Sequence, residues 1–420
     1  MASIRYGLGQ PPPELSSGVA MIRATDVDAG AIRTDNFLRV DPAELPPDRN
    51  PYLKAGDIIV VRSGAYTGDS AIVPSALEGA VAGYDMVATV TRASSQFVAY
   101  SLLSKHVLED QIHLLTLRAA QPHLNAEELG SVVLAMPPTR SEQRRIAAYL
   151  DASCAAIDAA VAAKRRQLET LDVLSNSLIH RAVTHGLNER VTLKPSGLDW
   201  LPHVPRHWEV RQIKRRCDLL RGKFTHRPRN DPALYDGEYP FVQTGDITAA
   251  DKYIRSYSQT LNELGFSVSK GFPKGTLVMS IAANVGDVAI LDFEACFPDS
   301  MIGLVPDHCT NLDFLYYLMR AMKGIMLRCA VLTTQLNLNY VRIGTNFAPF
   351  PPKTEQEEIA RFLDAKLADV KRIVAGIETQ IATLAAYRKS LIHECVTGQR
   401  RITETDLAVS PQPDVLWAVR

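Results

Sequence analysis

Residues 137–151 read PPTRSEQRRIAAYLD, and residues 351–364 read PPKTEQEEIARFLD. The Glu-Gln, Ile-Ala and Leu-Asp pairs recur with a constant offset, because 355 − 142 and 364 − 151 are equal. The offset still holds at the far end, where Leu178-Ile179-His180 returns as Leu391-Ile392-His393. A duplication of this length predicts two related structural units, and missing it would lead to a wrong fold.

Each of the two stretches heads a long helix. Apolar residues follow at alternating intervals of four and three, which is the seam of a coiled coil, and no proline interrupts either run. Lys164, Ser175 and Arg388 are polar seam positions that we expect to set the register of one helix on the other. The apolar seam is Leu150, Ile157, Val161, Leu168, Leu171 and Leu178 in the first helix, and Leu363, Leu367, Val370, Val374, Ile377, Ile381, Leu384 and Leu391 in the second.

The starts of both helices are marked by double prolines, which favour extended geometry in the residue before them and so end a strand. Ser141 and Thr354 are the expected N-caps. Acidic Glu142 and Glu355 suit the positive end of the helix dipole. We therefore interpret the repeated Glu-Gln pair as helix capping rather than chemistry.

The segments before the helices also repeat, more faintly. Residues 54–73 and 274–291 each read as strand, turn and strand, and helices are expected over 97–109 and 313–323. The predicted fold class is α+β, with two β-rich domains separated by two long antiparallel coiled-coil helices in a pseudo-two-fold internal repeat. The expected divisions are 1–138 (first domain), 139–185 (first helix), 186–206 (a Pro- and Gly-rich linker), 207–352 (second domain), 353–398 (second helix) and 399–420 (a mobile tail).

Composition narrows the class of protein. The chain of 420 residues is 46% hydrophobic, enough for more than one core, and it has no long apolar run of the kind that spans a membrane. Residues 1–18 lack the apolar segment of a secretory signal, and the six cysteines form no CxxC pair. We expect a cytoplasmic protein with reduced thiols.

The formal charge is zero, which argues against indiscriminate binding to polyanions. One local basic segment stands out in the second half, between residues 211 and 229, where Asp218 is the single acid. A solvated flank and a phosphate-binding face are both open interpretations of such a segment. The first hundred residues contain no comparable basic segment.

Catalytic signatures are missing from the sequence. It has no Walker A run, and we predict no catalytic residue and no metal site. Asn50-Pro51-Tyr52 resembles a fragment of the Asn-Pro-Pro-Tyr motif of amino methyltransferases, but it reads more simply as a turn. The glycine pair in Tyr6-Gly7-Leu8-Gly9 has no strand before it and no helix after it, and is weak support for a cofactor.

The duplicated Pro-Pro, Glu-Gln, Ile-Ala and Leu-Asp pattern resembles the specificity subunit of type I restriction-modification systems. In each half the pattern follows a globule that ends in a Gln-x-x-Leu-Asn stretch, at residues 121–125 and 335–339. The resemblance covers residues 6–398. One departure is that the segment 200–216, which the family usually also has before its first domain, has no counterpart ahead of residue 6.

The resemblance implies that residues 1–138 and 207–352 are target-recognition domains, each of which reads one half of a split, asymmetric sequence in double-stranded DNA. The helices would fix the distance between the half-sites. Two modification subunits would use S-adenosylmethionine to methylate adenine, and restriction subunits would use ATP and magnesium to translocate and cut. This chain would hold no cofactor and would be non-catalytic.

Residues that read bases should be polar or basic side chains on loops, because arginine matches guanine, and glutamine or asparagine matches adenine, through two hydrogen bonds. For any one of these residues an ordinary turn role is the alternative. The base-contact candidates are Arg62, Ser63, Tyr66, Thr67, Gln121, His123, Ser280, Asn284, Gln335 and Asn337, and the phosphate candidates are Lys214, Arg215, Lys223, Arg227 and Arg229.

Two other classes of protein stay open. A coiled-coil scaffold or adaptor that does not bind DNA would explain the helices, but not the related globules before them. A hidden nuclease or methyltransferase would need a metal cluster or a cofactor loop that the sequence does not show. DNA retention by the assembled complex, and methyl transfer by the chain alone, separate these classes.

Overall fold

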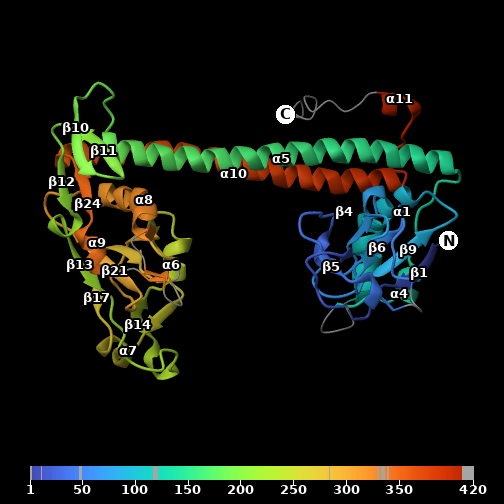
Figure 1. Ribbon diagram of the computed structural model, residues 1–420, viewed down its shortest axis with the longest axis horizontal. Coiled ribbons are helices and arrows are strands. Elements are labelled where there is room, and N and C mark those ends of the chain that lie inside the picture. The colour runs from blue at the N-terminus through green and yellow to red at the C-terminus, as the bar shows by residue number, and fades with distance from the viewer. Residues whose placement is uncertain are drawn as a thin grey trace. The chain divides into compact units, whose positions relative to one another are not determined.

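The computed structural model describes residues 2–10, 12–46, 50–116, 122–282, 284–328, 331–332, 336–337 and 340–408. The chain forms two compact units. Unit 1 comprises residues 1–166 and 376–420, and unit 2 comprises residues 167–375. Both ends of the chain therefore belong to unit 1, and the two longest helices, α5 (Arg140–His185) and α10 (Lys353–Val396), each contribute to both units (Figure 1).

Unit 1 is built on a four-stranded antiparallel sheet in the order β1 (Ala2–Tyr6), β9 (Met86–Val90), β6 (Ile58–Val60) and β7 (Ser70–Ile72). A second sheet has the order β5 (Leu38–Val40), β2 (Val19–Ile22) and β8 (Val81–Ala82). Every residue of β6 is buried, because one face packs against α1 (Ser95–Leu102) and the other against the second sheet. The strands match the predicted segment 54–73.

The helix predicted over 97–109 is broken in the structure. It is divided into α1 and α2 (Lys105–Val107), and a π-helical turn follows at Leu108–His113. The hydroxyl of Ser104 donates to the carbonyl of Ser101 (2.7 Å) at the break. A local bond of this kind competes with the helical ladder.

Unit 2 repeats this design. Its main sheet has the order β13 (Cys217–Arg221), β21 (Met301–Pro306), β18 (Leu277–Ser280), β19 (Val288–Leu291) and β15 (Tyr253–Ile254). A second sheet has the order β16 (Gln259–Leu261), β14 (Tyr235–Phe241), β20 (Ala295–Cys296) and β17 (Gly271–Phe272). The helix α8 (Leu312–Arg328) packs its apolar face into the core and includes the predicted segment 313–323.

The repeated glutamines join each unit to its long helix. In unit 1 the buried Gln143 accepts a hydrogen bond from the backbone N–H of Ser94 (2.9 Å), which precedes α1, and donates to the carbonyl of Pro137 (3.0 Å). In unit 2 the buried Gln356 accepts from the N–H of Asn311 (2.8 Å), which precedes α8. The interpretation of the glutamines as caps is wrong, because each side chain bonds another segment of its unit.

The repeated aspartates make a second matching contact. The hydroxyl of Tyr100 on α1 donates to Asp151 (2.8 Å), and that of Tyr317 on α8 donates to Asp364. Two fully buried phenylalanines, Phe97 and Phe314, occupy the same turn of α1 and α8. The internal repeat thus extends from the sequence motif into a shared set of contacts.

The two long helices run antiparallel within each unit. In unit 1, Leu150 near the start of α5 shares a buried cluster with Leu391 near the end of α10. In unit 2, Val183 near the end of α5 shares a cluster with Leu363 near the start of α10. The predicted apolar seam residues are all buried or half-buried, and this burial follows the four-three spacing.

Two of the three polar seam positions are paired across the helices, whereas the hydroxyl of Ser175 donates to the carbonyl of Leu171 in its own helix (2.7 Å). The amine of the buried Lys164 donates to Gln380 Oε1 (2.6 Å), and Arg388 Nε lies 3.3 Å from Asp158 Oδ1. Such pairs favour one register because a shift of either helix would leave a buried charge without its partner.

The helix starts differ from the predicted caps. The hydroxyl of Thr139, not that of Ser141, accepts from the N–H of Glu142 (3.3 Å) at the start of α5. Thr354 lies inside α10, which begins at Lys353, and the carbonyl of Pro352 accepts the first helical bond from Gln356 (3.0 Å). The first turn extends closer to each double proline than the capping pattern indicates.

The linker predicted over 186–206 contains an antiparallel hairpin, so the interpretation as a connector without elements is wrong. Its strands are β10 (Leu193–Leu198) and β11 (Leu201–Pro205). The register shifts between Pro195 and Leu198, and Gly197 has a φ of +77°. Glycine adopts this conformation at little cost. Prolines are tolerated here because the hairpin is a two-stranded sheet of its own, in which both strands are edges.

A further antiparallel pair of strands in unit 2 consists of β12 (Glu209–Gln212) and β24 (Phe347–Phe350), and β24 directly precedes the double proline before α10. At the matching place in unit 1, before α5, the described residues 132–138 contain no strand, and Val133 is 66% exposed.

The tail predicted to be mobile from residue 399 is partly folded. Ile402 is buried in the cluster that α5 and α10 form in unit 1, and its carbonyl accepts from Arg145 Nε (2.9 Å). A short helix, α11 (Glu404–Ala408), follows. The prediction is therefore wrong for residues 399–408, because an apolar side chain anchors them, and residues 409–420 lie outside the described residues.

Of the described helices, one is long and apolar enough to cross a membrane by length and composition. It is α5, which contains an 18-residue window with a mean hydropathy of 1.5, of which 33% is buried. One face of that helix packs against α10, and its Asp158 pairs with Arg388. We therefore interpret its apolar character as helix packing.

Candidate nucleic-acid interface

Three base-contact candidates lie together in unit 1. Arg62 and Ser63 follow β6, and His123 reaches them from a distant segment through an isolated bridge between Ser63 and His123. His123 Nε2 lies 3.2 Å from Arg62 Nη2, and His123 Nδ1 lies 2.7 Å from Ser63 Oγ. The structure therefore forms one polar cluster from residues that are 60 positions apart.

Two exposed tyrosines complete this cluster, and neither is among the residues predicted to contact bases. The guanidinium carbon of Arg62 lies 4.5 Å from the ring centroid of Tyr6 and 4.3 Å from that of Tyr84. Tyr6 is the last residue of β1, and Tyr84 lies just before β9. Both are close to Arg62 because β9 pairs with β1 on one side and with β6 on the other. The one local signal in the sequence is the glycine pair beside Tyr6, which is weak on its own.

The other described candidates in unit 1 separate into an exposed and a buried residue. Tyr66 is 53% exposed on the turn after Arg62. Thr67 is buried, and its hydroxyl donates to the carbonyl of Gly64 (2.7 Å). The Thr67 hydroxyl is therefore bonded within its own turn, and its role as a base contact stays a prediction. Gln121 lies outside the described residues.

In unit 2 the candidates do not gather into a comparable cluster within the described residues. Ser280 has 0% exposure at the end of β18 and donates to the carbonyl of Ala282 (2.6 Å), and its role as a base contact stays a prediction. Asn284 is exposed and donates to Thr248 Oγ1 (2.8 Å). Asn337 lies in β23 (Leu336–Asn337), and Gln335 lies outside the described residues.

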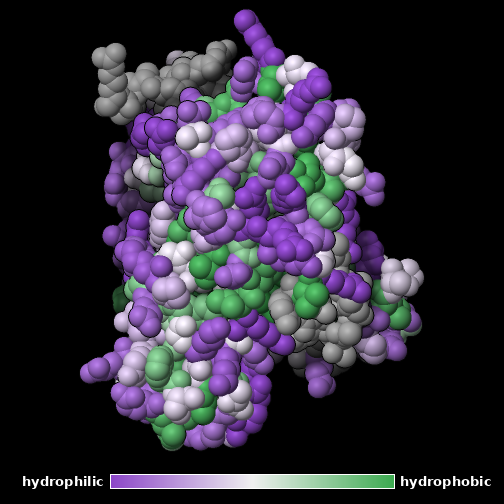
Figure 2. Space-filling view, turned by 90° about the vertical axis from the view of Figure 1, so that its left-hand side faces the viewer, coloured by the Kyte–Doolittle hydropathy of each residue, from purple (hydrophilic) through white to green (hydrophobic). Residues whose placement is uncertain are grey.

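The phosphate candidates differ in their pairing. Arg227 and Arg229 both approach the carboxylate of Asp299, Arg227 at 3.7 Å, so their charge is partly compensated. Lys214, Arg215 and Lys223 are exposed and make no ion pair within the described residues. Figure 2 looks onto the side of the molecule drawn at the left of Figure 1, where unit 2 lies, and shows polar residues interspersed with small apolar groups.

A buried carboxyl lies beneath the Arg62 cluster. Asp85 is 2% exposed, accepts from the backbone N–H of Arg62 (3.2 Å) through Oδ1, and leaves Oδ2 without a hydrogen-bond partner in the described chain. Burial raises the pKa of Asp85 to about 6, which the hydrogen bond and the nearby guanidinium of Arg62 only partly oppose. The folded chain therefore binds a proton at this site more tightly than the unfolded chain does.

This raised pKa predicts a pH dependence of stability. Because the folded state holds the extra proton between pH 4 and 6, the stability contributed by this site falls as pH rises through that window and is constant above it. Each unit of pKa corresponds to about 1.4 kcal/mol. Relative to the natural chain, Asp85→Asn should therefore gain about 2–3 kcal/mol in free energy of unfolding between pH 4 and pH 7, as measured by urea denaturation. An equal difference at both pH values would contradict the assignment.

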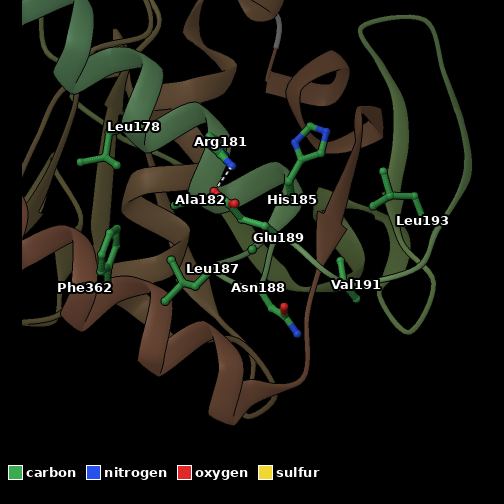
Figure 3. Close-up of a pocket in the computed structure, with 11 residues that line it drawn as sticks. Leu178, Arg181, Ala182, His185, Leu187, Asn188, Glu189, Val191, Leu193 and Phe362 are labelled. Atoms are coloured by element: carbon green, nitrogen blue, oxygen red, sulfur yellow. Dashed lines mark hydrogen bonds and ion pairs between the residues drawn. The ribbon is translucent and has the colours of Figure 1, made fainter.

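A cavity of about 280 Å³ lies at the end of α5 in unit 2 (Figure 3). Leu178, Leu187 and Phe362 form its apolar side, and Arg181 donates to Glu189 (2.5 Å) across it. Burial is the main cause that lowers the pKa of His185, which also lines the cavity. Its charged side chains Arg181 and Glu189 pair with each other.

The described residues contain no group of three or more His, Cys, Asp or Glu side chains that could hold a metal ion. The polar cluster of unit 1 consists of an arginine, a hydroxyl and an imidazole on loops. This chemistry suits hydrogen bonding to base edges and phosphates.

Comparisons with known proteins agree with this description. Residues 205–383 match the sequence model of the family described as type I restriction modification DNA specificity domain. A curated protein of Methanocaldococcus jannaschii, named as the putative specificity subunit of the type I restriction enzyme MjaX, is 24% identical over 293 residues. The match covers 67% of this chain and spans 62% of the length of that relative.

Solved structures show the same fold. One is a chain from a structural study of complex assembly and conformational transition in the type I R-M system. It has a TM-score of 0.73 at 17% identity, and the match covers 94% of this chain and 98% of that chain. The HsdS subunit from Thermoanaerobacter tengcongensis has a TM-score of 0.50 at 17% identity, with 94% and 97% covered.

The resemblance stated from the duplicated motif is therefore confirmed. Residues 205–383 are similar to a type I restriction-modification DNA specificity domain, and the chain has the fold of the solved HsdS subunit, a mixed helix and sheet fold with two long helices.

Proposed function

We propose that this chain is the DNA-specificity subunit of a type I restriction-modification complex. Each of its two units would read one half of a bipartite, asymmetric target in double-stranded DNA. The observation that carries the proposal is the duplicated junction, in which a buried glutamine and an aspartate–tyrosine contact tie each β-rich unit to the long helices. The match to a DNA specificity domain supports the same conclusion.

The two units differ where they would read bases, which favours an asymmetric target. Unit 1 presents a cluster of Arg62, Ser63 and His123, whereas unit 2 buries Ser280 and presents exposed lysine and arginine side chains instead. The shared framework would give each of two modification subunits an equivalent docking face. Those subunits would supply S-adenosylmethionine chemistry, restriction subunits would use ATP and magnesium, and this cytoplasmic chain would be non-catalytic.

Mapping of methylated adenine tests the proposal. The chain would be co-expressed with modification subunits from its gene neighbourhood, and the host DNA would be sequenced by a single-molecule method that detects N6-methyladenine. We expect one split motif with two unlike halves, and none when this chain is omitted. Methyl transfer by the purified chain alone, or a complex that does not retain DNA, would instead favour a catalytic protein or a scaffold.

The long helices should control the spacer between the half-sites. Four residues inserted after Arg166 and four after Ala375 lengthen both helices by about 6 Å, slightly more than one turn. Coiled coils accommodate such an insertion by local unwinding. Since base pairs are about 3.4 Å apart, the spacer in the methylated motif should grow by one or two base pairs while both halves stay the same.

A matched control places the same four residues after Asp199, an exposed residue in the turn between β10 and β11. This variant should keep the original spacer. If the variant with insertions in both α5 and α10 kept both half-sites and the original spacer, the long helices would be excluded as the determinant of spacing.

A further inference from the structure

Unit 1 contains a cavity of about 500 Å³ that is built around Arg62. The rings of Tyr6 and Tyr84 both lie against its guanidinium group, and Asn50 and Arg5 complete the wall. The glycine pair noted in the sequence, Gly7 and Gly9, also lines this cavity. At Gly7 a Cβ atom would lie 2.1 Å from the carbonyl oxygen of Gly83, so only glycine allows this close approach.

The guanidinium group is held from several directions before any ligand arrives. Since arginine offers only donors, its Nη2 must donate to His123 Nε2, which places the imidazole proton on Nδ1, toward Ser63 Oγ. The Tyr6 hydroxyl accepts from the backbone N–H of Ala126 (2.9 Å), which fixes that ring. Two aromatic rings and one donor are thus in use, and Nη1 makes no hydrogen bond within the described part of the chain.

A guanidinium stacked against aromatic rings binds through its edge. That edge is a planar fork of N–H donors, which pairs with two acceptors at once, whether they belong to a base edge or to a phosphate. Among base edges, guanine presents this pair as O6 and N7. The exposed rings of Tyr6 (42%) and Tyr84 (47%) leave a flat approach to the fork.

The matching positions of unit 2 do not repeat this arrangement. Across the sheets, the register Tyr6, Met86 and Val60 corresponds to Arg221, Ile302 and Met279. Two residues beyond Val60 is Arg62, and two beyond Met279 is Ile281, which is buried. The stacked arginine is therefore a property of unit 1 and not of the shared framework.

We propose that the Tyr6–Arg62–Tyr84 stack reads the O6 and N7 edge of one guanine in the half-site recognised by unit 1. This assignment rests on the proposed function as a DNA-specificity subunit. It makes Arg62 a specificity determinant and His123 the residue that positions it.

The test uses the complex with its modification subunits and a duplex that carries the mapped motif. Each guanine of both half-sites is replaced in turn by 7-deazaguanine, which lacks N7. For the natural complex, one guanine in one half-site should weaken binding about tenfold when its N7 is removed. For the Arg62→Gln complex, the same replacement should have no effect, and the methylome should accept other bases at that position alone.

Arg33→Gln is the matched control, because Arg33 is an exposed arginine of the same unit that pairs with Asp28 (2.6 Å). It should keep both the motif and the sensitivity to 7-deazaguanine. If Arg62→Gln fails to fold, Arg62→Lys keeps the charge without the fork and should show the same loss of discrimination.

Two results would overturn the assignment: no guanine whose N7 matters in either half-site of the natural complex, or a variant at Arg62 with unchanged sensitivity. Failure of the proposed function looks different, because the natural complex would then bind no motif at all.

Discussion

Replacement of Phe97 by alanine is expected to lower the free energy of unfolding of unit 1 by about 3–5 kcal/mol. Phe97 has 0% exposure and lies on α1, in the cluster that also contains Leu150 of α5 and Leu391 of α10. The large cavity left by the ring would loosen the β-rich part of unit 1 from both helices at once. Urea denaturation of the purified chain, followed by circular dichroism, measures the loss.

Leu114→Ala provides the control for Phe97, because Leu114 is an apolar residue of the same unit that is 57% exposed. Surface substitutions of this kind change stability by about 0.5 kcal/mol or less. Equal effects of the two substitutions would show that Phe97 does not hold the junction.

The second large effect is expected at Gln356. Its side chain accepts from Asn311 N–H and donates to the carbonyls of Cys309 (3.1 Å) and Pro351 (2.8 Å). Gln356→Ala leaves three backbone groups without these partners, and each unsatisfied buried group costs about 1–3 kcal/mol. We therefore expect a loss of at least about 3 kcal/mol in the free energy of unfolding of unit 2.

Two further variants separate this role from a general effect of helix substitution. Glu358→Ala, two residues further along α10 at an exposed position, should change stability little. Gln356→Glu should not restore stability, because a carboxylate cannot donate to the two carbonyls. Full stability of Gln356→Ala would return the glutamine to the capping role that its sequence position indicates.

The long helices could be predicted from sequence because their signal is local and repeated. Apolar residues at four-three spacing fix which face is buried, and the constant offset reports the duplication directly. The strands on either side of the glycine turns were also predictable, since Gly68 and Gly286 both adopt positive φ angles in the turns between the paired strands.

The remaining features depend on contacts between distant residues, which a single sequence does not show. Gln143 bonds Ser94, 49 positions away, and the sequence around it fits a cap equally well. Pro195 and Gly197 indicate a loop by composition, but they are compatible with strand pairing in a two-stranded hairpin. The Arg62 cluster joins residues from distant segments, and nothing near Tyr84 in the sequence marks it as a partner.

The division of the chain also has a consequence for synthesis on the ribosome. Unit 2 is one continuous stretch, whereas unit 1 needs residues from 376 onward. At a synthesis rate of about 5 to about 20 residues per second, the whole of unit 2 takes roughly 10 to roughly 40 s to translate. During that time Leu150 and Phe97 lack the helix that will cover them, so the half of the protein that is made first is the half that is completed last.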